Sequence, residues 1–478
     1  MKIAIFSDVY KPMISGVTVS IDNLTKNLVA RGHEVKVFTV NYPKKAEPPK
    51  GVTVDYSRGV VMPTYKEHRM ATPSSIRLLL KARKFRPDVL HAMTPFGMGS
   101  QAMIISKALN IPIIYTEHSI YPDFVKHISL KSVKGFSKID LLFKNILSAQ
   151  ITFTSIYGCY LISFYKSLVA LRMNKILKRA EKIKVRKSIK RQLRKFMSLG
   201  LKLKALGKRE TYRSLKPRNI KTKIKSVSAR QYTKLMWSYF LHVYNQSDLC
   251  STPSQAMKNI MLYHGAKTKV IPISNGIDRT VFKKKKVKKS KNFKIIHVGR
   301  IAFEKNIDVT IKAVAEVIKK HPSVKFDIIG NGPQINEMKQ LVKDLKLTKN
   351  IKFKGQIKNT SLPNHYSAAH LFVTASTIET EGLVMLEAMS CGIPVVAVDK
   401  LACPYVVKQG KNGYIAPVGD YKKMAFYIEK LIKNKTLLNK LSKTALEMSR
   451  NYDLQCIVTR WEKIYSDVIK NYKKKRKK

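Results

Sequence analysis

The feature that most constrains the fold is an alternation of short apolar strands and helices, which occurs in two separate halves of the chain. The first half opens with an apolar strand at residues 3–7, a loop, a helix from about 18 to 31 and a second strand at 35–40. A second series of the same kind starts with a strand at 293–298. Strands that are joined by crossover helices form parallel sheets. The sequence therefore predicts an α/β fold with two Rossmann-like halves.

The length of the chain also favours two domains, because 478 residues exceed one ordinary hydrophobic core. We predict an N-terminal domain at residues 1–275, a C-terminal domain at 285–455, and a C-terminal helix with a basic tail at 456–478. The lysine-rich residues 283–291 are interpreted as a solvated linker between the domains, and the lysine-rich residues 473–478 as a disordered end.

The middle of the chain breaks this pattern, and we expect an insertion in the N-terminal domain at about 130–237. Residues 145–165 are 21 consecutive residues without a charge, which is long enough for a membrane-spanning helix. Their Ser, Thr and Gln residues leave an interfacial helix and a buried hydrophobic segment open as well. Residues 166–225 then hold 23 Lys and Arg against two Glu, a net charge of +21. A basic stretch with an apolar stripe is typical of an element that lies on anionic lipid, and a flexible solvated insertion is the alternative. The residues predicted to contact the membrane or the acceptor are Lys184, Arg186, Lys187, Lys190, Arg191 and Arg194.

The charge of the whole chain points to polyanionic partners. Lys and Arg number 92 against 30 Asp and Glu, which gives a net charge of +62. A positive field of this size attracts nucleic acid, acidic lipid surfaces or phosphorylated substrates, although a preference for lysine codons explains part of the excess. No nucleic-acid recognition module is visible, so no specific nucleic acid is expected.

Cysteine usage and the N-terminus indicate a reducing, cytoplasmic compartment. The five cysteines are widely spaced and form no Cys-x-x-Cys pair or Cys/His cluster, so neither a disulfide framework nor a structural zinc site is predicted. The first residues are interpreted as a strand and a loop, not as a signal peptide, because Asp8 interrupts the apolar run early.

The most specific stretch for chemistry is 379–397, which combines a loop, a glycine, a helix, a turn and a strand. A helix N-terminus presents free N–H groups and a partial positive charge, which suit a phosphate. The residues at this N-terminus are Gly382, Leu383 and Val384. Glu387 lies one to two turns into the helix, where its carboxylate could accept hydrogen bonds from a ribose diol. Glu379, in the loop, would face another part of the same ligand; a solvated helix face is the alternative for the pair.

A second stretch supplies cations. Arg300 and Lys305 follow the strand at 293–298, at the carboxyl end where α/β sheets bind ligands. Arginine offers a forked set of donors and lysine a point charge, and together they suit a diphosphate. Two basic residues mean little by themselves in so basic a chain.

Taken together, these stretches resemble glycosyltransferase family 4, whose members have the GT-B fold of two Rossmann-like domains facing a central cleft. The resemblance covers nearly the whole chain outside about 130–240. It implies that the N-terminal domain binds the acceptor and that the C-terminal domain binds the nucleotide sugar. It also implies that Glu379 holds the transferred sugar, that Glu387 holds the ribose, and that Arg300 and Lys305 hold the pyrophosphate.

The resemblance extends to two sites in the first half of the chain. His118 matches the active-site histidine of the family, so His118 and Glu379 are the expected catalytic residues. Gly16 belongs to the loop that lets backbone approach the donor phosphate, but Ser15 stands where family members usually have another glycine.

Three stretches, FSDVYKPMISGV, TEHSIYPDFVKHI and ETEGLVMLEAM, look like bacterial diacylglycerol glucosyltransferases, especially those of wall-less bacteria. Glu381 occupies a position where many family 4 enzymes have an aromatic residue. The implied reaction moves glucose from UDP-glucose to 1,2-diacylglycerol with retention of anomeric configuration. It would occur at the cytoplasmic face of the cell membrane, where anionic lipids would hold a peripheral protein.

No cofactor is expected beyond the donor substrate. The sequence has no Asp-x-Asp motif, so no protein-bound metal is predicted, although Mg²⁺ could stimulate the reaction through the diphosphate. Two alternatives stay open: the same fold with another acceptor, such as a phosphatidylinositol-like lipid, a soluble sugar or a sugar phosphate, and a non-catalytic membrane- or RNA-binding protein on this scaffold.

Overall fold

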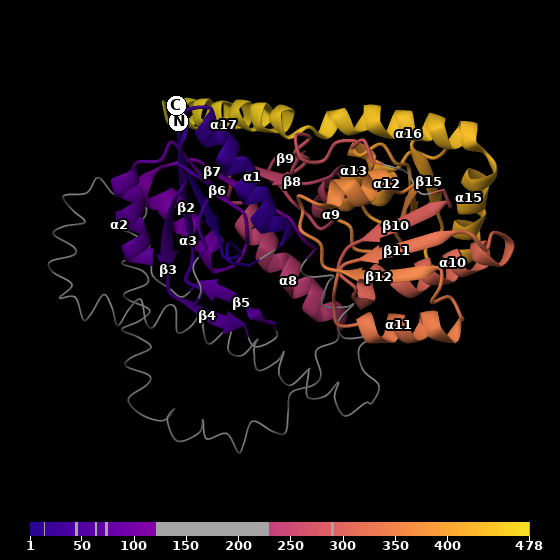
Figure 1. Ribbon diagram of the computed structural model, residues 1–478. Coiled ribbons are helices and arrows are strands. Elements are labelled where there is room, and N and C mark those ends of the chain that lie inside the picture. The colour runs from indigo at the N-terminus through magenta and orange to yellow at the C-terminus, as the bar shows by residue number, and fades with distance from the viewer. Residues whose placement is uncertain are drawn as a thin grey trace, which may run out of the picture.

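A computed structural model describes residues 1–13, 15–43, 46–62, 65–71, 75–120, 229–287 and 291–477. The described chain forms two lobes, each built around its own parallel sheet (Figure 1). Most of the predicted insertion, including the uncharged residues 145–165, the basic residues 166–225 and the six cationic side chains singled out above, lies outside the described residues. Only its end, at 229–237, is described, as the start of helix α8.

The first lobe contains a seven-stranded parallel sheet in the order β3-β2-β1-β6-β7-β8-β9. Its strands are β1 (Lys2–Ser7), β2 (Glu34–Val40), β3 (Thr53–Ser57), β6 (Val89–Ala92), β7 (Ile113–Thr116), β8 (Leu249–Thr252) and β9 (Val270–Pro272). Its helices are α1 (Gly16–Ala30), α2 (Ser75–Phe85), α3 (Gly97–Leu109), α8 (Ala229–Tyr244) and α9 (Gln255–Tyr263). A separate antiparallel hairpin is formed by β4 (Gly59–Met62) and β5 (Tyr65–Ala71).

The second lobe contains a six-stranded parallel sheet in the order β12-β11-β10-β13-β14-β15. Its strands are β10 (Lys294–Val298), β11 (Lys325–Ile329), β12 (Ile351–Gly355), β13 (Leu371–Val373), β14 (Val395–Val398) and β15 (Gly413–Ala416). Its helices are α10 (Ile307–Lys320), α11 (Ile335–Asp344), α12 (Leu362–Ala368), α13 (Leu383–Ser390), α14 (Cys403–Val406), α15 (Tyr421–Lys433) and α16 (Lys435–Ser449), with 3₁₀ turns η1 (Phe303–Lys305) and η2 (Arg450–Tyr452).

Both sheets are buried on their two faces, which explains why their strands are almost continuously apolar. In β10, Ile295 packs into one hydrophobic core of the second lobe and Ile296 into the other. In β1, Ile5 and Phe6 likewise belong to different cores. The predicted α/β class with two Rossmann-like parallel sheets is therefore confirmed.

Helix α17 (Leu454–Lys477) returns from the second lobe and packs against the first (Figure 1). Trp461 and Tyr465 are buried in the same core as β1, and Arg31 at the end of α1 forms an ion pair of 2.6 Å with Glu462. The prediction that residues 473–478 form a disordered end was wrong for 473–477, because the helix continues through Lys477. Lysine and arginine are good helix formers, and they extend a helix whose preceding turns are anchored by packing.

The two sheets are separated by a short stretch of chain. The first sheet ends with β9 at Pro272 and the second begins with β10 at Lys294. We propose that the domain boundary lies between them, with α17 belonging to the first lobe. Among the helices of the described residues, none combines the length and the apolar composition needed to cross a bilayer.

Candidate active site

The candidate site lies where the strand order of the second sheet reverses. Strand β10 pairs with β11 on one side and with β13 on the other, so the loops that follow β10 and β13 diverge at their carboxyl ends. Open α/β sheets bind ligands in the crevice at such a point. The loop after β10 carries Arg300 and Lys305, and the loop after β13 carries Glu379.

Lys305 and Glu379 contact each other directly across these two loops. The distance from Lys305 Nζ to Glu379 Oε1 is 2.5 Å, and both side chains are largely buried. Burial alone would raise the pKa of Glu379, but the Lys305 ammonium outweighs this effect and holds the pKa below its usual value. An ammonium has three N–H donors, so Lys305 keeps donors for a ligand while it orients the carboxylate.

Arg300, in the same loop as Lys305, lies nearer the surface. Its guanidinium pairs with Glu304 four residues later, and its side chain is 45% exposed. The loop after β10 packs closely against the turn after β11. A Cβ on Gly330 would lie 1.8 Å from the carbonyl oxygen of Gly299. Glycine at position 330 therefore allows the backbones of the two loops to touch.

The start of α13 directly follows the loop that carries Glu379. Gly382 is its N-cap with φ of 81°, a left-handed conformation that favours glycine. In the described part of the chain, no acceptor is found for the backbone N–H groups of Leu383 and Val384, whereas those of Met385 and Leu386 bond to Gly382 O. These two N–H groups, with the helix dipole behind them, can bind an anionic oxygen.

Glu387 lies one turn further along α13. Its Oε2 accepts a hydrogen bond of 2.9 Å from the hydroxyl of Tyr366 on α12. Desolvation raises the pKa of Glu387 to about 7, and the Tyr366 hydroxyl only partly opposes this rise. The remaining lone pairs of the carboxylate can accept hydrogen bonds from a diol.

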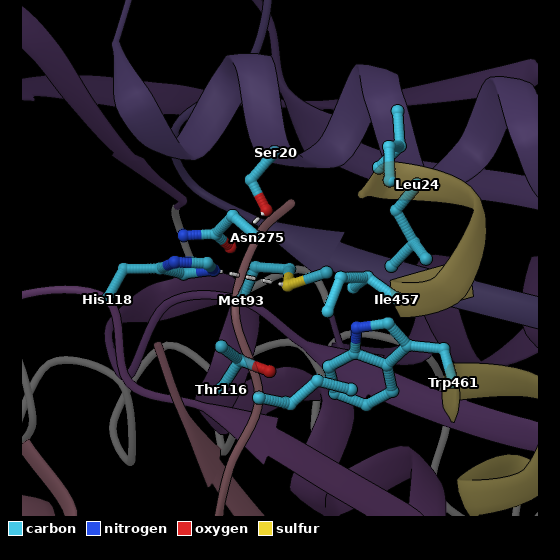
Figure 2. Close-up of a pocket in the computed structure, with 10 residues that line it drawn as sticks. Ser20, Leu24, Met93, Thr116, His118, Asn275, Ile457 and Trp461 are labelled. Atoms are coloured by element: carbon cyan, nitrogen blue, oxygen red, sulfur yellow. Dashed lines mark hydrogen bonds between the residues drawn. The ribbon is translucent and has the colours of Figure 1, made fainter. Parts of the chain in front are cut away.

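In the first lobe, His118 follows β7 and lies against a small cavity of about 10 Å³. Figure 2 shows its imidazole directed at Met93, with Nε2 3.5 Å from the thioether sulfur. Desolvation lowers the pKa of His118 to about 4, so the ring is neutral near pH 7. Because a thioether sulfur can only accept, this contact places the proton on Nε2 and leaves Nδ1 as an acceptor. His118 is thus a hydrogen-bonding group rather than a proton donor at neutral pH.

The structure brings His118 together with the loop that carries Glu379. The hydroxyl of Thr380, the next residue after Glu379, donates a 3.0 Å hydrogen bond to the backbone carbonyl of His118. Ser254 at the start of α9 donates a 2.5 Å hydrogen bond to the carbonyl of Thr380. The two predicted catalytic residues, which are 261 positions apart in the sequence, therefore belong to segments in direct contact.

Gly16 is the first residue of α1, and a Cβ built on it would meet no atom within 4 Å. Ser15, which replaces the expected glycine, is the N-cap of this helix and accepts a 3.2 Å hydrogen bond from the N–H of Thr18. The serine therefore stabilises the helix start, a role that the Ser-x-x-Thr pattern could have indicated. The open space at Gly16 leaves the backbone accessible.

Sequence reasoning missed three polar residues of this region: Tyr366, Thr380 and Asn275. Tyr366 holds Glu387, Thr380 contacts the first lobe, and Asn275 lies between the lobes. Of these, only Asn275 could have been noticed in the sequence, because it belongs to an Asn-Gly pair after a strand, a pair that is typical of a turn. Among the described residues, no group of three or more His, Cys, Asp or Glu side chains could hold a metal ion.

Chemically, the crevice of the second lobe combines cations and free N–H groups with two carboxylates. The cations and the helix start suit a diphosphate, and the carboxylates suit the hydroxyl groups of sugars. Groups that are held in place before the reaction stabilise charge that develops on a leaving diphosphate.

Comparisons with known proteins agree with this geometry. The family model for glycosyl transferases group 1 matches residues 278–448, and the model for Glycosyltransferase Family 4 matches residues 14–154. The alpha-monoglucosyldiacylglycerol synthase of Acholeplasma laidlawii is 27% identical over 100% of both chains. The synthase of the same name from Streptococcus pneumoniae is 24% identical over 83% of this chain and 71% of its own length.

Solved structures share the fold at lower identity. Anabaena HepE, solved in complex with UDP, aligns over 98% of this chain and 100% of its own with a TM-score of 0.64 and 17% identity. Sucrose-phosphate synthase from Thermosynechococcus elongatus aligns over 98% and 99% with a TM-score of 0.64 and 15% identity. The two parallel-sheet lobes and these structural neighbours show the GT-B fold, and the two family models, which together match more than half of the chain, show that it belongs to the family 4 type of glycosyltransferases.

Proposed function

We propose that this chain transfers a hexose, with glucose as the first candidate, from a UDP-sugar to the free hydroxyl of 1,2-diacylglycerol, with retention at the anomeric carbon. The observation that carries the proposal is the pairing of a complete donor crevice with full-length similarity to a relative named alpha-monoglucosyldiacylglycerol synthase. The crevice supports a nucleotide-diphosphate donor, and the relatives' names support the lipid acceptor and the alpha product.

On the donor side, each group has a distinct part. Glu387 accepts from the ribose hydroxyls, and Arg300, Lys305 and the start of α13 bind the diphosphate. As the bond between the anomeric carbon and the diphosphate breaks, negative charge grows on the leaving oxygen, and these cations and N–H groups stabilise it. Glu379, oriented by Lys305, accepts from hydroxyls of the transferred sugar and holds its anomeric carbon toward the first lobe.

On the acceptor side, the first lobe brings the hydroxyl to the same face of the sugar that the diphosphate leaves. The neutral His118 ring offers a hydrogen-bond acceptor beside the Glu379 loop, and it orients a hydroxyl without taking up a proton at neutral pH. Holding both substrates in one geometry replaces an encounter in solution by a reaction between neighbours. The departing diphosphate oxygen takes up the proton of the acceptor hydroxyl as the new bond forms.

The location proposed for this reaction is the cytoplasmic face of the membrane, with the protein bound peripherally. Diacylglycerol resides in the bilayer, and a chain with a net charge of +62 is attracted to anionic lipid headgroups. Residues 166–225, with a net charge of +21, are the strongest contributor in the sequence.

The test is direct. Purified protein is incubated with labelled UDP-glucose or, separately, UDP-galactose, and with anionic vesicles that contain or lack diacylglycerol, and the lipids are separated by thin-layer chromatography. We expect a monohexosyl lipid only with diacylglycerol and mainly from UDP-glucose, and anomeric proton couplings in NMR that report the alpha product. If a product forms only with phosphatidylinositol, a soluble sugar or a sugar phosphate, that molecule is the acceptor instead of diacylglycerol. Absence of any affinity for sugar nucleotides would refute the whole proposal. The Glu387→Gln variant, whose donor affinity should be lower, serves as the control and should form less product at the same donor concentration.

A further inference from the structure

One buried carboxylate of the donor loop takes no part in the crevice described above. Glu381 is only 4% exposed, and three donors surround it. Its Oε1 accepts from the backbone N–H of Asn275 at 2.8 Å and from the hydroxyl of Ser274, and its Oε2 accepts from the side-chain amide of Asn275. Desolvation raises the pKa of Glu381 to about 7 although these donors oppose the rise, and in the described part of the chain no cation offsets its charge.

The partners of Glu381 lie in the segment that connects the two lobes. Ser274 and Asn275 follow β9, the last strand of the first sheet. Two residues later, the N–H of Ile277 donates 2.7 Å to the carbonyl of Tyr452, where the chain crosses back toward α17. Glu381 is therefore held by the connection between the lobes and not by its own lobe.

Asn275 extends this contact to the first lobe. Its side-chain oxygen accepts a 2.6 Å hydrogen bond from the hydroxyl of Ser20 on α1. Figure 2 shows Ser20 and Asn275 on one wall of the cavity that His118 also lines. The chain of contacts Glu381–Asn275–Ser20 thus runs from the donor loop, through the connection between the lobes, to helix α1 of the first lobe.

Three consecutive residues of the donor loop consequently face three different partners. Glu379 contacts Lys305 in the donor crevice, Thr380 contacts the backbone of His118, and Glu381 contacts Asn275. We propose that Glu381 is a positioning residue for glycosyl transfer: through Asn275 and Ser20 it fixes the donor loop relative to the first lobe. The inference rests on the glycosyltransferase activity but not on the identity of the acceptor.

The physical basis is that a buried polar group is costly to leave without its partners. A glutamine at position 381 has the same shape but one oxygen fewer, so its NH₂ group would face a donor of Ser274 or Asn275. The donor loop would then lose at least one of the hydrogen bonds that link Glu381 to Ser274 and Asn275. It would move more freely relative to α1 as a result. The donor crevice itself, formed by Lys305 and the start of α13, would stay intact.

The experiment compares Glu381→Gln, Ser20→Ala and the double variant. We expect Glu381→Gln to lower kcat about tenfold, as loss of one well-made buried contact does, while the Kd for UDP-glucose changes less than about twofold. Ser20→Ala should lower kcat by a smaller factor, roughly threefold, and the double variant should be no slower than Glu381→Gln alone, because both changes break the same chain. The matched control is Glu337→Gln on the exposed face of α11, which should leave kcat unchanged.

A second readout does not require turnover. Spin labels at Lys26 on α1 and Lys339 on α11, both exposed and each replaced by cysteine in a background without Cys159 and Cys456, report the distance between the lobes. We expect one narrow distance distribution for the UDP-bound wild type and a broader one for Glu381→Gln.

The proposal would be overturned if the double variant lowered kcat by the product of the two single effects. It would also be overturned if the spin-label distance distribution of Glu381→Gln were as narrow as that of the wild type. An equal loss of donor affinity would overturn it too, because Glu381 would then be a donor ligand. If Glu381→Gln does not fold, Ser20→Ala alone should lower kcat with an unchanged Kd for UDP-glucose and should broaden the distance distribution, and failure of both effects would overturn the proposal. If the wild type forms no glycosyl diacylglycerol, the acceptor is wrong, and the spin-label distances still decide the role of Glu381.

Discussion

The raised pKa of Glu387 leads to a quantitative prediction about donor binding. Its carboxyl has a pKa of about 7 in the unliganded protein because desolvation disfavours the charged form. Ribose hydroxyls donate hydrogen bonds, so the donor binds the ionised form and releases a proton from the protonated form. Affinity for UDP-glucose should therefore rise with pH through 7.

The magnitude follows from the ionised fraction. With a pKa of about 7, roughly nine-tenths of Glu387 is ionised at pH 8 and about one-tenth at pH 6. The Kd for UDP-glucose should thus be about tenfold higher at pH 6 than at pH 8, a difference of about 1.4 kcal/mol. In Glu387→Gln this dependence should vanish, and the affinity at pH 8 should fall by about 1.5–3 kcal/mol, the range for a hydrogen bond to a charged group.

Isothermal titration calorimetry at pH 6, 7 and 8, in two buffers of different ionisation enthalpy, measures both the Kd and the protons released. About 0.9 proton per UDP-glucose should be released at pH 6 and about 0.1 at pH 8. UDP-glucose is the correct probe because its diphosphate diester does not titrate in this range, whereas the terminal phosphate of UDP does. Glu381 also has a pKa of about 7, so Glu381→Gln is the control that must keep the slope. A wild-type Kd that is the same at pH 6 and 8, or an equal slope in Glu387→Gln, would refute the reasoning.

Three further predictions concern stability and membrane binding. Lys305→Met leaves the carboxylate of Glu379 buried without its cation and should cost about 3 kcal/mol, or roughly 6–12 °C in Tm by calorimetry. The double variant with Glu379→Gln should recover part of that loss, and a double variant less stable than both singles would argue against the pairing. Burial raises the pKa of Glu117 to about 8, so this group stabilises the fold fully below its unfolded pKa and loses that contribution as pH rises through 8. The Tm of Glu117→Gln should therefore exceed that of the wild type at pH 9 but not at pH 5, and equal differences at both values would contradict this. Deleting residues 166–225 should lower co-sedimentation with anionic vesicles, and unchanged sedimentation would exclude them as the lipid-binding element.

Much of the fold could be predicted from the sequence because the strands of a buried parallel sheet are short apolar runs and their connections are local. The strand predicted at 293–298 overlaps β10, and the helix expected to start near Leu383 does so. The prediction of a disordered end was wrong for residues 473–477 because their structure is decided by packing at a distance and not by local sequence. Whether a basic segment continues a helix depends on what anchors the preceding turns, and here that anchor is the first lobe.

That Glu379, Gly382 and Glu387 lie near one another could be predicted in the same way, because they belong to one local stretch whose geometry follows from a loop and a helix start. The contacts that these residues make with other segments could not be predicted, although Lys305 itself was expected in the donor site. Lys305 contacts Glu379 across 74 positions, and Tyr366 contacts Glu387 across 21. Such pairs depend on the direction in which two separate loops leave the sheet.

The sequence by itself thus determines the strands, the helices and the residue types of the donor loop, because each depends on neighbours within one or two turns. The relation between the lobes depends on contacts over far greater separations: Ser20 with Asn275 across 255 positions, Thr380 with His118 across 262, and α17 on β1. No local pattern encodes these contacts, because each requires two surfaces that exist only after both sheets have folded. The placement of Glu381 between the lobes is therefore a property of the packed molecule.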